Sequence, residues 1–97
     1  MASFIVLFNW TDQGIKGFRD SPARVDAASS QLAKLGVTIR EIYWTIGVHD
    51  LVGVVEAPDP ESLTAALLAL GSAGNVRTTT LRAFNRDEFA KVIAKLG

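Results

Sequence analysis

The chain has 97 residues, with ten basic and ten acidic side chains, no cysteine and a single histidine. That length predicts one domain with a core large enough to fold without disulfide bonds or a structural metal ion. The balanced charge argues against nucleic acid and against an anionic membrane surface as partners, and with one histidine and no cysteine neither a metal site nor a cofactor is expected.

The first predicted element is a strand over residues 3–10, whose apolar side chains alternate between both faces. Such two-sided apolar character is typical of a central strand that is covered on both sides. The run is too short for a signal peptide or a membrane span, so we expect a cytoplasmic protein. Residues 14–18 contain two glycines and are compatible with either a loop or a short helical turn.

A helix is predicted to run from an N-cap at Ser21 to about Leu35, with Pro22 at its first position. Residues 37–57 are predicted to form a β-hairpin, because two runs rich in Val, Ile, Tyr and Trp flank a connection in which Gly47 supplies the turn. This hairpin is the only place where two strands are expected to follow each other without a helix between them.

Two helices and one strand complete the chain. Asp59 followed by Pro60 marks the start of a helix, and a threonine-rich strand is predicted over residues 76–84. Asn85 with Glu88 three residues later resembles a capping box that opens a terminal helix. That last helix carries an apolar stripe, which is expected to pack against its own domain: Phe89, Val92, Ile93 and Leu96.

The predicted order, β-α-β-β-α-β with one further helix, indicates an α+β ferredoxin-like sandwich formed by a single domain over residues 1–97. Right-handed crossovers then give a four-stranded antiparallel sheet in the order 4-1-3-2, with the first and third strands in the middle. Two helices cover only one face of such a sheet, so the apolar side chains on the other face stay bare. We therefore predict a homodimer, or a multiple of one, that packs sheet against sheet.

Four stretches of the chain resemble the GYD domain family: QGIKGFRDSPAR at 13–24, GVHD at 47–50, VEAPDPE at 55–61 and GSAGNVRTTTLRAF at 71–84. The family is named for a Gly-Tyr-Asp signature, to which Gly47 and Asp50 correspond, whereas His49 stands where tyrosine is usual. The resemblance implies a small bacterial protein with the dimeric α/β-barrel fold. The resemblance implies no activity. Similar folds include cofactor-free monooxygenases, isomerases and small ligand-binding modules, so the fold by itself does not give a function.

Strand direction brings distant residues to one edge of the predicted sheet, where the first two strands end and the last two begin. Both tryptophans and the only histidine are expected at this edge, together with polar groups that a ligand site would need. A competing interpretation is that the tryptophans cap the core and the polar groups close turns. The candidate ligand-binding residues are Trp10, Trp44, His49, Asp50, Asn75 and Arg77.

Two functions stay open. The first is a homo-oligomeric module that binds a small apolar molecule or another protein. The second is a cofactor-independent enzyme, monooxygenase-like or isomerase-like, that acts on a small apolar or aromatic substrate with His49 as candidate catalytic base beside Asn75 or Arg77. The lone histidine and the scarcity of acid/base pairs favour the binding module.

Overall fold

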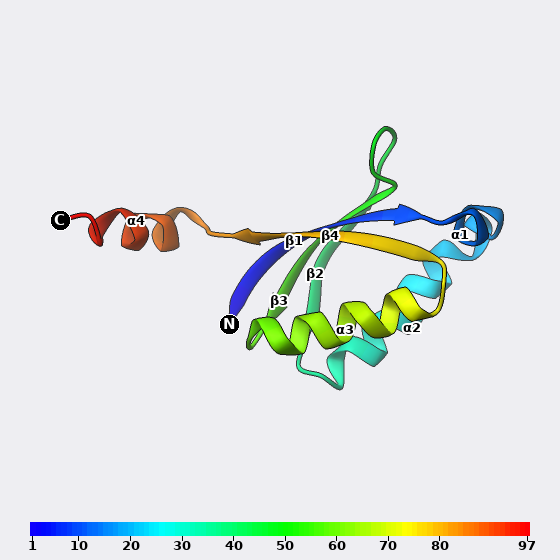
Figure 1. Ribbon diagram of the computed structural model, residues 1–97, viewed down its shortest axis with the longest axis horizontal. Helices are drawn as coiled ribbons and strands as arrows, with labels where there is room; N and C mark the ends of the chain where they lie inside the picture. The colour runs from blue at the N-terminus through cyan, green and yellow to red at the C-terminus, as the bar shows by residue number, and fades with distance from the viewer.

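The computed structural model describes all 97 residues, Met1–Gly97, and contains one four-stranded antiparallel sheet (Figure 1). The strands lie in the order β2 (Thr38–Trp44), β3 (Leu51–Ala57), β1 (Ala2–Trp10) and β4 (Val76–Ala83). This is the predicted order, with β1 and β3 in the middle, and the α+β ferredoxin-like class is confirmed. The predicted hairpin is formed by β2 and β3.

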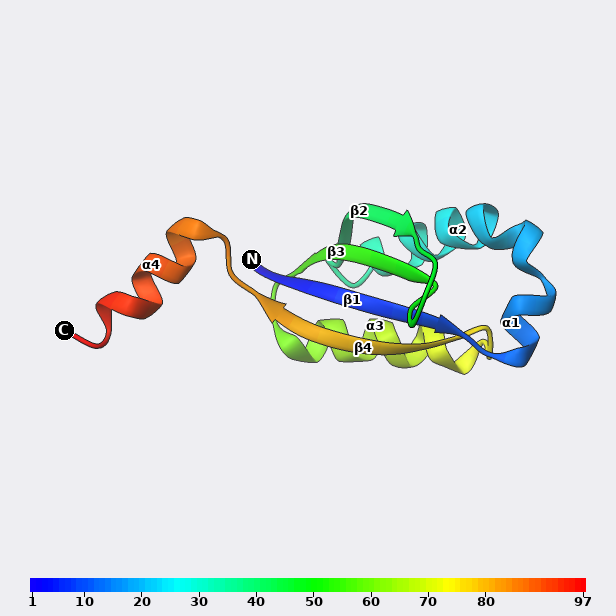
Figure 2. The ribbon, with the colours of Figure 1, turned by 90° about the horizontal axis from the view of Figure 1, so that it is seen from above.

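Helices α2 (Ser21–Ala33) and α3 (Pro60–Ser72) lie on the same side of the sheet (Figures 1 and 2). A short helix, α1 (Asp12–Lys16), follows β1, and α4 (Arg86–Ala94) follows β4. None of these helices is both long and apolar enough to cross a membrane.

The helix starts follow from capping chemistry at two of the three predicted sites. The Asp59 carboxylate accepts the backbone N–H of Ser62 at 2.6 Å, and this hydrogen bond lowers the pKa of Asp59 below its usual value. The capping box between Asn85 and Glu88 is present. The predicted N-cap at Ser21 is wrong, because a 3₁₀ turn over Phe18–Asp20 runs directly into α2 and makes Ser21 its first helical residue.

The hydrophobic core lies between the sheet and the two helices. Alternate residues of β1 and β3 point into it, as expected for strands with period-two burial. Gly53 of β3 lies opposite Val6, where a side chain would come within 3.3 Å of the Phe8 ring. The buried apolar residues are Phe4, Val6, Phe8, Leu32, Val37, Leu51, Val55, Ala57, Leu63 and Ala66.

The other face of the sheet, which we call the open face, carries no helix (Figure 1). The connection between β2 and β3 rises on this same side, and its tip residues Ile46 and Val48 are fully or largely exposed. The predicted bare apolar face therefore exists in the single chain. Its central apolar side chains are Ile5, Leu7, Val52 and Val54.

Helix α4 departs from the prediction. It projects beyond the end of the sheet, in the direction in which β4 leaves the domain (Figures 1 and 2). The Phe89 side chain is 53 % exposed and that of Leu96 is 87 % exposed, so the expectation that the stripe packs on its own domain is wrong. The reason is the direction of the chain rather than the length of the connection: after Phe84 and Asn85, α4 continues outward from the end of β4, whereas α3 reverses over the sheet after the equally short connection that follows β3.

Candidate functional site

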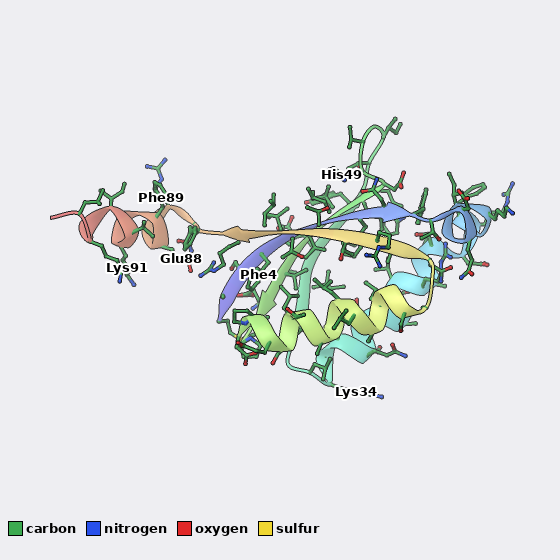
Figure 3. All side chains as sticks on the ribbon, viewed as in Figure 1. Phe4, Lys34, His49, Glu88, Phe89 and Lys91 are labelled. Atoms are coloured by element: carbon green, nitrogen blue, oxygen red, sulfur yellow. The ribbon has the colours of Figure 1, made fainter.

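The residues predicted to form a site lie at the expected edge of the sheet, but on two different sides of it. Successive residues of a strand point to opposite faces, so neighbours in the sequence are separated by the sheet itself. Figure 3 shows His49 at the base of the hairpin connection, on the side away from α2 and α3. The six predicted residues therefore do not line one common cleft.

Three of the candidates lie on the helix side. Trp10, at the end of β1, and Asn75, just before β4, both line a cavity between the sheet and the helices. The indole N–H of Trp44 donates to the Ser21 hydroxyl at 3.0 Å, which ties the end of β2 to the start of α2. Trp44 therefore contacts the first residue of α2, whereas Trp10 and Asn75 line the cavity that Ser21 also lines.

Two candidates lie on the side of the open face. The Nδ1 atom of His49 is 2.7 Å from the Asn9 side-chain oxygen, and the Asn9 amide donates to the Val48 carbonyl at 2.6 Å. Arg77 is exposed and lies opposite Asn9 in the pairing of β1 with β4. Of the two suggested partners for His49, Arg77 shares its side of the sheet and Asn75 does not.

Asp50 attaches the hairpin to β1. Its carboxylate accepts the Trp10 backbone N–H at 2.8 Å, and its own backbone N–H donates to the Phe8 carbonyl at 2.9 Å. Its carbonyl accepts the Thr45 N–H at 2.8 Å, which closes the connection. These three bonds agree with the competing interpretation of a polar residue that closes a turn.

We predict that Asp50→Ala lowers the free energy of unfolding by about 1–3 kcal/mol, because the Trp10 N–H loses its acceptor in a half-buried position. Urea unfolding followed by tryptophan emission measures the change. Asp50→Asn is the matched control, since its amide oxygen still accepts the bond, and it should retain most of the stability. An equal loss in both variants would contradict the assigned role.

The sequence interpretation missed Arg24 and Gly14. The guanidinium Nη2 of Arg24 donates to the carbonyls of Gly14 and Gly17 at 3.1 and 2.9 Å, which fixes the segment between β1 and α2. Gly14 lies directly against the backbone of Asn75, so this segment also contacts the loop before β4. Thr11, which caps α1 through the Gly14 N–H, is the local signal that predicts a helix there despite the glycine.

The cavity has a volume of ≈ 210 Å³ and lies between the sheet on one side and α2 and α3 on the other. Its lining is predominantly hydrophobic, with Ser21, Arg24, Gln31 and Asn75 as its polar members. The chain contains no cluster of three or more His, Asp or Glu side chains that could hold a metal ion.

The chain is similar to known proteins both in sequence and in fold. The family model that matches it is the GYD domain, over residues 4–93. A protein of Thermus thermophilus, named "Glutamine synthetase and cystathionine beta-lyase binding protein", is 37% identical over an alignment 97 residues long that covers 99% of this chain and 99% of that protein.

Two solved structures are similar in fold. The crystal structure of a protein from Thermus thermophilus superposes with a TM-score of 0.56 and 30% identity, over 88% of this chain and 95% of that one. An ACT domain protein from Streptococcus pneumoniae gives a TM-score of 0.49 and 23% identity, over 86% of this chain and 90% of its own.

Proposed function

The chain belongs to the GYD domain family, and from that premise we propose that it is a homo-oligomeric binding module whose partner is a metabolic enzyme. The Thermus relative is named for its binding of glutamine synthetase and cystathionine beta-lyase. We extend this kind of partner to the present chain. The observation that carries the proposal is the exposed, projecting helix α4.

Helix α4 has the form of a ligand for a groove on another protein. Its apolar stripe faces solvent, while Asp87 and Lys91 occupy other faces of the helix (Figure 3 labels Phe89, Glu88 and Lys91). An amphipathic helix that is laid into a hydrophobic groove is a common mode of recognition. The capping box of Asn85 and Glu88 stabilises the helix before the partner arrives, which reduces the ordering entropy lost on binding.

A second copy of the chain is the proposed occupant of the open face. A two-fold axis would place the same apolar patch of each copy against that of the other, with Leu7 and Val52 near its centre. The hairpin tip, with Ile46 and Val48, would then flank the partner copy. Such a dimer presents two α4 helices, and two linked binding elements raise the avidity for an oligomeric enzyme without any new contact.

The test is binding of purified glutamine synthetase and cystathionine beta-lyase from the same organism, measured by surface plasmon resonance with the full chain. The double variant Phe89→Ser with Ile93→Ser should weaken binding roughly a hundredfold, because two apolar side chains would no longer be buried in the complex. Its matched control is Asp87→Ser with Lys91→Ser on the polar side of the same helix, which should bind within about threefold of the unaltered protein.

Two outcomes would contradict the proposal. Binding of neither enzyme by the unaltered protein would show that the partner class is wrong. Equal losses in the apolar and polar variants would show that the apolar stripe is not the binding element. Light scattering on both variants separates this result from a change of oligomeric state, because the proposed dimer interface does not include α4.

A further inference from the structure

The cavity is apolar over most of its lining and carries polar groups near the start of α2. Val6 and Val55 of the central strands form part of its sheet side, and Leu32 and Leu63 lie on the helix side. Ala28 of α2 also lines it, and its small side chain leaves space between α2 and the sheet. Ser21 and Arg24, one turn apart on α2, are on the same face of the helix and line the same cavity.

The Ser21 hydroxyl has an unused donor. Its side chain is 4% exposed and its oxygen accepts the Trp44 indole N–H. An indole nitrogen can only donate, so the proton of the Ser21 hydroxyl is not used in that bond. No hydrogen bond donated by this hydroxyl is present within the chain. Ser21 can therefore donate to a molecule inside the cavity.

Arg24 adds a positive charge without a carboxylate partner. Its Nη2 group is occupied by the carbonyls of Gly14 and Gly17, but no bond within the chain uses its Nε or Nη1 groups. The one ion pair of the chain joins Arg40 and Glu56, so the Arg24 charge is not neutralised by a salt bridge. The available groups of Ser21 and Arg24 are donors, which selects a ligand group that only accepts.

We propose that this cavity binds a small apolar carboxylic acid as its anion, with the carboxylate at Ser21 and Arg24 and the apolar part among the valine and leucine side chains. A volume of ≈ 210 Å³ exceeds the roughly 150 Å³ of an engineered apolar cavity that accepts benzene. The size therefore suits one aromatic ring with a short chain. This site lies apart from α4 and the open face, so it does not depend on the proposed enzyme binding.

The test uses the full chain with 3-phenylpropionate as the probe and 3-phenylpropanamide as its neutral isostere. Binding is measured by calorimetry and by the tryptophan emission of the chain, to which Trp10 of the cavity lining contributes. The acid should bind about tenfold or more tightly than the amide, because hydrogen bonds to a charged acceptor are roughly twice as strong as neutral ones. The acid should also raise the melting temperature.

Two variants locate the site. Ala28→Leu fills the cavity and should abolish binding of the acid, whereas Ala65→Leu, at an exposed position of α3 that does not line the cavity, should preserve it. Arg24→Gln should remove the preference for the acid over the amide. The melting temperature of each variant without ligand checks that it is folded.

Three results would overturn the proposal: no binding of the acid at millimolar concentration, equal binding of the acid and the amide by the unaltered protein, or undiminished binding of the acid by a folded Ala28→Leu variant. If Ala28→Leu or Arg24→Gln fails to fold, the proposal is tested by the unaltered protein alone, through the difference in affinity between the acid and the amide.

Discussion

Replacing Leu7 by lysine is expected to convert the protein from the proposed dimer to a monomer of 10.4 kDa. Leu7 lies on the open face of β1, opposite Val52 of β3 and Thr79 of β4. Neither neighbour is a carboxylate that could pair with the new ammonium group. In a dimer that packs sheet against sheet the lysine would be buried in an apolar interface, at a cost of several kcal/mol for each charge. In a monomer the same lysine stays in water.

Light scattering at micromolar concentration measures the mass, and circular dichroism checks that the variant is folded. Leu68→Lys is the matched control, because Leu68 is 69% exposed on α3, away from the open face, and the same substitution there should leave the dimer intact. A Leu7→Lys variant that stays dimeric would exclude the open face as the interface. An unaltered protein that is monomeric would exclude the dimer itself.

The strand order could be predicted because it depends on local patterns and on one rule of chirality. The alternation of apolar residues marked β1 and β3 as strands with two apolar faces, and the right-handed crossover rule then placed them in the middle of the sheet. The cap at Asp59 and the capping box at Asn85 were equally local, since each involves residues within one helical turn.

Helix α4 shows where a pattern is insufficient. The stripe of Phe89, Val92, Ile93 and Leu96 indicates that one face of a helix needs a partner, but the pattern does not say whether that partner belongs to the same chain. The direction in which the chain leaves β4 decides this, and it carries α4 beyond the end of the sheet. Helix α1 is a second case in which the local pattern is insufficient. Gly14 weakens the prediction of a helix there, but the close approach of the Asn75 backbone leaves no space for any larger residue at this position.

The candidate site could be predicted only as an edge of the sheet. Strand direction places Trp10 and His49 at one end, and both are found there. The face on which each side chain lies depends on pairing and on the conformation of the connection: Asn9, which contacts His49, points away from the side of Trp10. The cavity was not predictable, because its volume depends on how far α2 and α3 stand from the sheet.

Replacing Gly14 by alanine is expected to lower the free energy of unfolding by about 3 kcal/mol, at the upper end of what overpacking costs. A Cβ atom at Gly14 would lie 1.9 Å from the carbonyl oxygen of Asn75, which is backbone and cannot rotate away. That carbonyl also accepts the Thr11 N–H at 3.1 Å, so moving the loop breaks a bond between the end of β1 and the start of β4. Both the clash and the lost hydrogen bond would displace Asn75, which is one of the polar residues that line the cavity.

The matched control for this prediction is Gly71→Ala in α3, where the nearest atom to a new Cβ is the Val76 carbonyl oxygen at 3.9 Å. There the alanine fits without a clash and restricts the unfolded chain, so it should stabilise the protein by about 0.4–1 kcal/mol. Urea unfolding of both variants measures the two changes, which should have opposite signs. A Gly14→Ala variant as stable as the unaltered protein would mean that α1 does not lie against the loop before β4, and the position of Arg24 at the cavity would have to be revised with it.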